Sequence, residues 1–159
     1  MPITIETLTD DQRVWAHEII EDNWGSTRMV SRGVLYDVTT FPGLVAVLDD
    51  QRVGLLTYRI EAGECEIMSL DSLVEGHGVG TALLAAVAEI ARAAGCQRLV
   101  LITTNDNTHA FRFYQRRGWR LCGVRVGAVD DARRLKPEIP LIGNDEIPIH
   151  DEIELEYCL

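Results

Sequence analysis

The chain has 159 residues, of which 47% are hydrophobic, and its 25 acidic and 15 basic side chains give a formal charge of −10. A single domain over residues 1–159 is expected at this length, with a core large enough to fold without disulfides or a structural metal. The negative charge disfavours nucleic acid and anionic membranes as partners, because lysine and arginine must neutralise the phosphates of both.

Cysteine spacing and the start of the chain indicate where the protein works. The four cysteines are far apart in the sequence, without the paired spacing of a zinc site. Reduced thiols and no metal are therefore expected. The chain begins without a basic and apolar leader, and no stretch is long enough to span a bilayer. A cytoplasmic location is the resulting expectation.

The first part of the chain predicts one helix and an antiparallel meander. The helix begins at Thr9 and Gln12, which have capping-box spacing, and it ends at Gly25. Residues 28–41 have an extended but irregular pattern. Strands are expected over 3–8, 44–48, 53–60 and 65–70, with turn signals at 49–52 and 61–64.

The hydrophobic period then changes from two to 3.6 residues. A helix with its apolar face over 83–91 ends at Gly95, and a buried strand over 98–103 follows, parallel to the strand over 65–70. Further elements are expected in this order: a helix over 108–117, a strand over 119–129, a loop of about twenty residues with three prolines, and a strand over 151–158 with Glu152, Glu154 and Glu156 outward.

A glycine-rich segment, Glu75-Gly-His-Gly-Val-Gly-Thr-Ala82, lies between a predicted strand and a predicted helix. Glycines there let a ligand approach the backbone, and the free amides at a helix start favour phosphate oxygens. A flexible helix start explains the glycines equally well. The segment lacks the lysine of a phosphate-binding P-loop and the third glycine of a dinucleotide-binding motif.

A second segment, Asn105 to Trp119, places Asn107 seven residues before Tyr114 and ends in Gly118-Trp119. Together with Gly78 and Gly80, these residues resemble the motifs of the GCN5-related N-acetyltransferase (GNAT) superfamily. The resemblance covers nearly the whole chain, and residues 133–154 resemble a bacterial subgroup. It implies an α/β (α+β) fold with a mixed, mostly antiparallel sheet of six to seven strands flanked by helices.

The resemblance also implies the activity and the site. Acetyl-CoA is the expected acyl donor, and a primary amine attacks its thioester directly while Tyr114 acts as general acid. Main-chain N–H groups near Leu70 and Asp71 are expected to hold the thioester carbonyl. The residues expected at the cofactor are Leu70, Ser72, Leu73, His77, Gly78, Val79, Gly80, Thr81, Ala82, Asn107 and Tyr114. Glu75 departs from the Gln or Arg of the family motif, which predicts weaker coenzyme A binding.

The acceptor amine must lose a proton before it attacks, which costs about 4.6 kcal/mol at pH 7 for an amine of pKa near 10.4. Glu66, acting through a water, and Asp71 are the two candidate bases. Glu66 is equally well explained as an exposed strand carboxylate. A non-catalytic coenzyme A or nucleotide sensor and a purely structural domain are the alternative functions.

The acceptor is expected to be a small-molecule or peptide amine, and a homodimer is possible for a protein of this kind. The loop from about Asp130 to His150 is expected to lie on the acceptor side of the site. Three prolines restrict its conformation, and insertions of this length without a function are uncommon.

Overall fold

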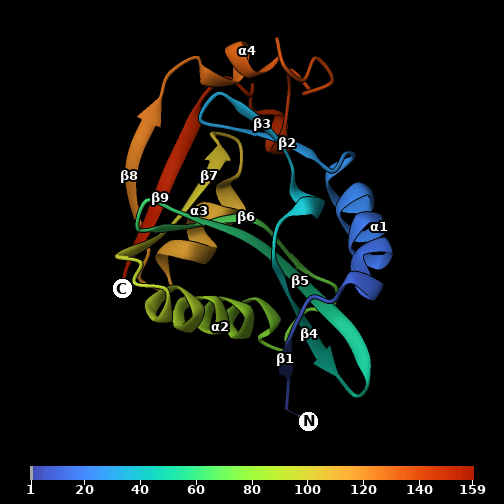
Figure 1. Cartoon of the computed structure of the whole chain (residues 1–159). Helices are drawn as coiled ribbons and strands as arrows, with labels where there is room; N and C mark the ends of the chain where they lie inside the picture. Colours follow the sequence, from blue (N-terminus) through green and yellow to red (C-terminus); the bar gives the residue numbers. More distant parts are fainter. Residues whose placement is uncertain (1) are drawn as a thin grey trace. The chain divides into compact units, whose positions relative to one another are not determined.

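The computed structural model of the protein describes residues 2–159 and divides them into two compact units. The first unit comprises the chain up to Thr27, Asp37–Leu99 and Leu159, and the second comprises Arg28–Tyr36 and Val100–Cys158. The strand order of the main sheet is β1-β4-β5-β6-β7-β9-β8, and β2 and β3 form a separate two-stranded sheet. A mixed, mostly antiparallel sheet with helices confirms the predicted fold class (Figure 1).

Four antiparallel strands form the sheet of the first unit. They are β1 (Thr4–Thr7), β4 (Gly43–Leu48), β5 (Gln51–Glu61) and β6 (Glu64–Ser72). The predicted meander is thus confirmed, with β4, β5 and β6 longer and β1 shorter than the sequence suggested. A register shift between Thr57 and Tyr58 leaves Met68 of β6 without a partner on β5, a bulge that increases the local twist.

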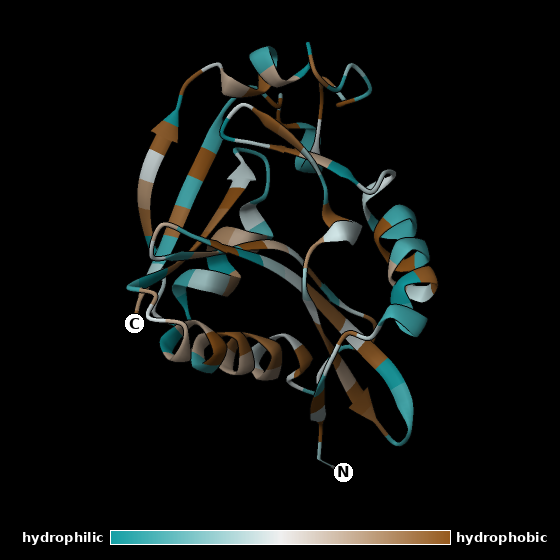
Figure 2. Ribbon diagram, in the orientation of Figure 1, coloured by the Kyte–Doolittle hydropathy of each residue, from teal (hydrophilic) through white to brown (hydrophobic). Residues whose placement is uncertain are grey.

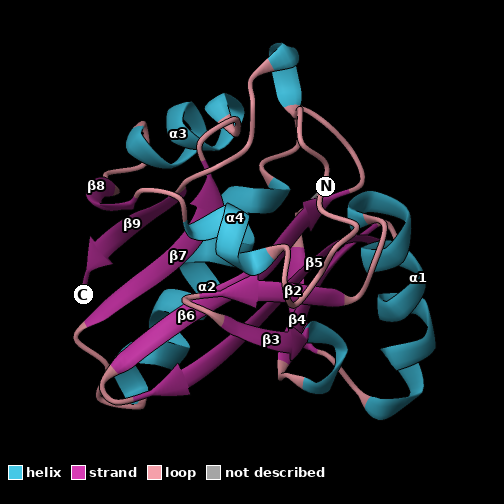
Figure 3. Cartoon of the chain, turned by 90° about the horizontal axis from the view of Figure 1, so that it is seen from above, coloured by secondary structure: helices cyan, strands magenta, loops and turns pink. Residues whose placement is uncertain are grey.

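Two helices of the first unit cover opposite faces of these strands. A 3-10 turn at Asp10–Gln12 leads into α1 (Arg13–Trp24), and α2 spans Val79–Ala93. The predicted end of α1 is confirmed, because Gly25 follows its last residue. The predicted capping box, in which Thr9 N donates to Gln12 Oε1 at 2.9 Å, begins the 3-10 turn, and α1 itself starts at Arg13. Figure 3 shows β4, β5 and β6 running side by side in this unit.

Gly54 brings the start of α2 against the sheet. A Cβ atom at this position would lie 2.4 Å from Val79 Cγ1 and 3.1 Å from Leu83 Cδ1. Gly54 therefore faces α2, and the next residue, Leu55, faces the α1 side because side chains alternate along a strand. A glycine inside a strand pattern is the signal for such a close approach.

The core of the first unit is aliphatic. Hydrophobic residues are frequent along β4, β5 and α2 (Figure 2). The fully buried side chains include Ile20, Val38, Val45, Leu55, Leu56, Leu83 and Val87. Burying a side chain of this size stabilises the fold by about 1.5–3 kcal/mol. Polar groups within such a core therefore need a separate explanation.

The second unit contains the strands and helices of the chain's later part. They are β2 (Arg28–Ser31), β3 (Val34–Asp37), β7 (Arg98–Thr104), α3 (Thr108–Gln115), β8 (Arg120–Arg125), α4 (Ala128–Ala132), a 3-10 turn at Asn144–Glu146, and β9 (Glu152–Cys158). The last residue of β3 and the first two of β7 belong to the first unit. The irregular segment 28–41 forms the β2–β3 hairpin, which turns at Arg32 and Gly33. Figure 3 shows α3 next to β8.

Two sequence predictions in this unit are wrong. The strand expected over 119–129 ends at Arg125, because Gly127 has a φ of 76° and starts α4. The outward placement of Glu152 and Glu154 is also wrong, since they are 3% and 8% exposed. β9 lies between β7 and β8 in the sheet, and Arg32 of the separate β2–β3 hairpin contacts Glu154.

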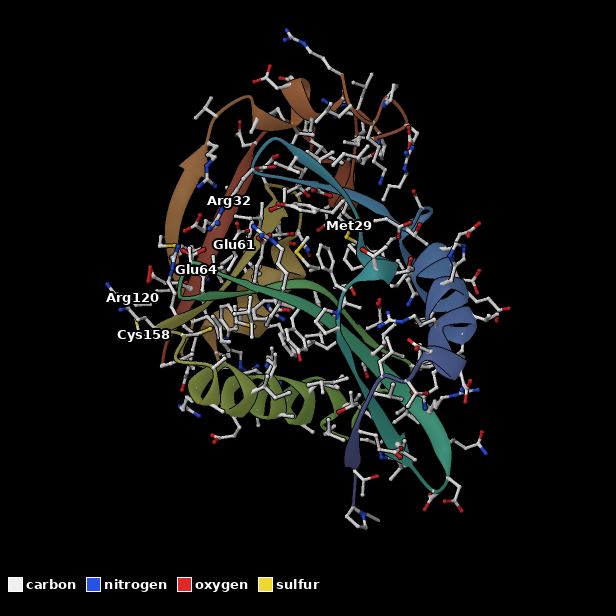
Figure 4. The ribbon with its side chains drawn as sticks, in the orientation of Figure 1. Met29, Arg32, Glu61, Glu64, Arg120 and Cys158 are labelled. Carbon is white, nitrogen blue, oxygen red and sulfur yellow. The ribbon has the colours of Figure 1, made fainter. Side chains whose placement is uncertain are left out.

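Glu154 is stabilised as an anion by three donors. Arg32 Nη2 and Arg125 Nη2 donate to its Oε1 at 3.0 and 2.9 Å, and Cys122 Sγ lies 3.3 Å from Oε2. Arg32 reaches it from the turn of the hairpin (Figure 4). Burial by itself raises the pKa of Glu154, but these hydrogen bonds outweigh burial and lower the pKa to about 2.

Acid should therefore destabilise the protein through Glu154. A carboxyl whose pKa is lowered in the folded state contributes stability above its ordinary pKa of 4.5 and loses it as the pH falls towards about 2. We expect the urea midpoint to fall between these pH values, and to fall less in Glu154→Gln, which cannot titrate. Equal slopes for the two proteins would contradict this assignment.

Candidate active site

The predicted phosphate-binding segment is an open loop that leads into α2. Residues 73–78 lie between β6 and the helix, and Gly78 occupies the position before the first helical residue with a φ of 71°. This left-handed conformation favours glycine. No atom lies within 4 Å of a Cβ built on Gly76 or Gly78. The loop is thus exposed, and a side chain at Gly78 would project into open space.

The start of α2 is suited to an anion. The first helical amides have no carbonyl partner within a helix, and the helix dipole adds positive potential there. No acidic residue lies in the first turn of α2. Ala82 N, which was expected to contact the ligand, donates to Gly78 O at 3.0 Å, so the earlier amides of Val79 and Gly80 are better placed for phosphate oxygens. His77 and Glu75 are exposed beside them.

Asp71 lies at the end of β6, on the α1 face of the sheet. It pairs with Leu55 of β5, whose side chain points away from α2. The last two residues of α1 bind its carboxylate: Asn23 Nδ2 donates to Oδ1 at 3.0 Å, and Trp24 Nε1 donates to Oδ1 at 3.0 Å. Burial raises the pKa of Asp71 above its ordinary value, and these two hydrogen bonds oppose the rise.

Glu66 is buried, and the interpretation of it as an exposed strand carboxylate is wrong. It is 3% exposed, and Arg59 Nε donates to its Oε1 at 3.1 Å from the paired position on β5. Arg59 also pairs with Glu61, which flanks the β5–β6 turn opposite Glu64 (Figure 4). Glu66 is thus held by a cation, whereas Asp71 is held by neutral donors.

Between the two carboxylates lies a buried pair of hydroxyls. Thr57 Oγ1 and Ser69 Oγ are 2.6 Å apart, and both residues are almost fully buried. β6 places the side chains of Asp71, Ser69 and Glu66 on the α1 face. Asp71 and Ser69 are two residues apart, and the extra residue Met68 at the bulge brings Glu66, three residues before Ser69, to the same face. A polar row of this kind costs stability unless it is hydrogen-bonded, and such departures from an apolar core are typical of functional sites.

The remaining cofactor residues of β6 and its loop are accessible. Leu70 is half-buried, while Ser72 and Leu73 are exposed. Ser72 Oγ donates to Val74 O at 2.7 Å, which shapes the turn into the glycine loop. The first unit therefore holds the two candidate bases and every predicted cofactor residue other than Asn107 and Tyr114.

Asn107 and Tyr114, in the second unit, lie at the start and near the end of α3. Asn107 caps the helix, because its Oδ1 accepts from Ala110 N at 3.2 Å, and its Nδ2 donates to Thr103 Oγ1 at 2.9 Å. Tyr114 is 8% exposed. Its ring packs edge-on against Phe113 and Trp119, each with a centroid distance of 5.0 Å.

The loop after α4 is ordered by side chains that bind main-chain carbonyls. Arg133 donates to Ile139 O at 3.2 Å, Pro140 O at 2.6 Å and Ile149 O at 2.8 Å. Asp106 is 4% exposed and accepts from Asn144 N at 3.0 Å. The loop predicted as irregular thus contains α4, a 3-10 turn and a bridge between Ile142 and Pro148.

Residues 2–159 contain neither a metal-binding cluster nor a membrane-spanning helix. No group of three or more histidine, cysteine or carboxylate side chains has a geometry that would hold a metal ion in this part of the chain. Within the same residues, no helix combines the length and the hydropathy needed to cross a bilayer.

Comparisons with known proteins agree with the motifs. A sequence model described as the acetyltransferase (GNAT) family matches residues 9–119. An uncharacterized protein from Bacillus subtilis (strain 168), YxbD, is 48% identical over 136 residues, which are 85% of this chain and 86% of that protein.

Solved structures share the fold. An IAA acetyltransferase from Bacillus cereus superposes with a TM-score of 0.71 at 19% identity, covering 99% of this chain and 100% of the other. A GNAT family acetyltransferase from Elizabethkingia anophelis, with acetyl-CoA bound, has a TM-score of 0.70 at 20% identity, covering 99% and 98% of the two chains.

Proposed function

Because this chain belongs to the GNAT family of acetyltransferases, we propose that it transfers an acetyl group from acetyl-CoA to a primary amine of a small molecule or peptide. The observation that carries the proposal is the open glycine loop before α2. Gly78 has a positive φ and free space around it, and no acidic side chain lies in the first turn. These features suit the pyrophosphate of coenzyme A.

In the proposed reaction, the amine attacks the carbonyl carbon of the thioester directly. Main-chain N–H groups near Leu70 and Asp71 stabilise the negative charge that develops on the carbonyl oxygen. The carbon–sulfur bond then breaks, and Tyr114 gives its hydroxyl proton to the departing thiolate. The Tyr114 phenolate regains a proton from the attacking nitrogen, which loses it as it becomes the amide. A carboxylate, Glu66 or Asp71, takes the proton that the ammonium must lose before it attacks.

A panel of amines tests this proposal. The purified protein is incubated with acetyl-CoA and, in turn, spermidine, glucosamine, lysine and an alanine-initiated peptide, and thiol release is followed with a chromogenic disulfide. We expect amine-dependent release with at least one member. Heat-inactivated protein is the control for chemical acetylation. Calorimetry with coenzyme A measures cofactor binding separately.

Glu75 supports a second function, a coenzyme A or nucleotide sensor without turnover. Its carboxylate lies three residues before Gly78, where the family motif has Gln or Arg. An anion beside a pyrophosphate weakens binding by like-charge repulsion. A sensor would bind coenzyme A and release no thiol with any amine, and Glu75→Gln would then tighten binding without creating activity.

The loop between α4 and β9 is proposed to select the acceptor. Removing residues 143–147 and joining Ile142 to Pro148 through two glycines keeps the Arg133 contacts and discards the bond from Asn144 to Asp106. We expect the KM for the acceptor to rise about tenfold, a loss of about 1.4 kcal/mol. The affinity for acetyl-CoA should not change. Equal losses of both affinities would assign the loop to folding instead.

A further inference from the structure

The α1 face of β5 and β6 offers two buried carboxylates to the proposed reaction, and their surroundings differ in charge. Glu66 is paired with the guanidinium of Arg59 at 3.1 Å. A proton on Glu66 would break this ion pair with a guanidinium that is only 19% exposed, and Arg59 would keep its contact with Glu61. Asp71 receives hydrogen bonds from an amide and an indole, which carry no charge. Proton uptake at Asp71 therefore breaks no ion pair.

The two oxygens of Asp71 are not equivalent. Oδ1 accepts from Asn23 Nδ2 and Trp24 Nε1, both at 3.0 Å. Oδ2 receives only the same indole N–H, at the longer distance of 3.3 Å. A carboxylate oxygen has two lone pairs, so Oδ2 retains the larger capacity to accept a further hydrogen bond. The donors of α1 thus fix the carboxylate in one rotation and leave one oxygen for another donor.

Several charged side chains of the neighbouring elements bind groups other than Asp71. On α1, His17 pairs with Glu21 at 2.7 Å, and Arg13 binds Thr39 O and Phe41 O. On β5, Arg59 pairs with Glu66 and Glu61. Burial is the largest influence on the carboxyl of Asp71, and the two donors of α1 oppose it. Asn23 and Trp24 are therefore the side chains best placed to tune its protonation.

We infer that Asp71 is the base that takes the acceptor's proton, and that Asn23 and Trp24 are positioning residues that hold its carboxylate and set its basicity. The inference rests on the proposed function. The ammonium of the acceptor donates to Oδ2 and transfers a proton to it, and the neutral amine then forms the new bond to the acetyl carbon. Asp71 returns the proton to water after the product leaves.

The hydrogen bond from Trp24 should set the pH at which Asp71 gains its proton. Its side chain remains partly exposed while its indole nitrogen reaches the buried carboxylate. Trp24→Phe removes this donor and keeps a ring, so the ionised form of Asp71 loses one hydrogen bond. Loss of a hydrogen bond to the charged form raises the pKa of the carboxyl, here by about one pH unit. The acidic limb of kcat/KM should move upward by that amount.

Matched variants test the inference with the best acceptor of the amine panel. We expect Asp71→Asn to lower kcat at least 100-fold, because general bases contribute about 10²-fold to 10⁴-fold. Its fold should survive, since the asparagine oxygen can still accept from Asn23 and Trp24. Asp22→Asn removes an exposed carboxylate from α1, the helix that carries Asn23 and Trp24, and controls for the loss of one negative charge. Trp15→Phe, whose ring lies under Arg52, is the control for the Trp24→Phe shift.

The outcomes separate this inference from the proposed function. Coenzyme A binding and amine-dependent thiol release in the parent protein establish the function, and their absence overturns both. If the parent is active and Asp71→Asn keeps its acidic limb and its kcat, Asp71 is not the base. An unshifted limb in Trp24→Phe would show that Trp24 is only structural. Loss of the limb in Glu66→Gln, with Asp71→Asn active, would assign the proton to Glu66.

Discussion

Replacing Gly78 by valine is expected to weaken coenzyme A binding at least tenfold, or by about 1.4 kcal/mol. The valine Cβ would project into space that is empty in the protein, at the position from which the first amides of α2 are approached. Glycine also adopts the φ of 71° without strain, whereas a β-branched residue there does not. Isothermal calorimetry with coenzyme A measures the loss.

Strain and ligand contact can be separated with a second glycine of the same loop. Gly76 has a φ of 76° and equally free surroundings, but it lies outside the first turn of α2. Gly76→Val should therefore lower the melting temperature as much as Gly78→Val does, with a smaller effect on affinity. If the two variants bind coenzyme A equally, the anion does not lie on the start of α2.

Local signals in the sequence were sufficient for the elements of the first unit. The turn that leads into α1 begins at the capping box of Thr9 and Gln12, and α1 ends before Gly25. Such signals are local because caps act through neighbouring backbone groups. The turns between β4, β5 and β6 were also predicted from short-range composition. In contrast, the turn of the β2–β3 hairpin contains Arg32, a non-glycine residue with a φ of 51°. Residue composition does not predict a positive φ at an arginine.

The parts that escaped prediction depend on contacts between distant residues. Asn23 and Trp24 bind Asp71 across 48 and 47 positions of sequence, so nothing near Asp71 indicates its donors. Arg133 orders its loop through carbonyl groups, which every residue possesses. The alternating pattern of β9 likewise does not reveal that Glu152 and Glu154 are buried, since Glu154 is contacted by Arg32, 122 positions earlier in the sequence.

Motifs located the candidate site more reliably than they assigned its chemistry. The glycine loop lies where the sequence placed it, between β6 and α2. Asn107 is at the predicted start of α3, yet its side chain also has a structural role as the helix cap. Tyr114 likewise belongs to a cluster of aromatic rings. Packing and catalysis therefore have to be separated by experiment at these residues.

Tyr114→Phe makes this separation, and we expect it to lower kcat by about tenfold to 100-fold, near the lower end of general acid catalysis. Phenylalanine keeps the ring that packs against Phe113 and Trp119 and removes only the hydroxyl. A phenol of pKa near 10 gives its proton to a thiolate of pKa near 8.5 at a cost of about 2 kcal/mol, so the expected effect is moderate.

Tyr157→Phe is the matched control, because its ring lies in the same cluster, 6.0 Å from Trp119, and the motif does not include it. Both variants should keep the parent melting temperature, and only Tyr114→Phe should lose turnover in single-turnover experiments that isolate the chemical step. The loss should shrink with an acyl donor whose thiol has a lower pKa, since a better leaving group needs less protonation. A Tyr114→Phe rate equal to that of the parent would reduce the tyrosine to a packing residue of α3.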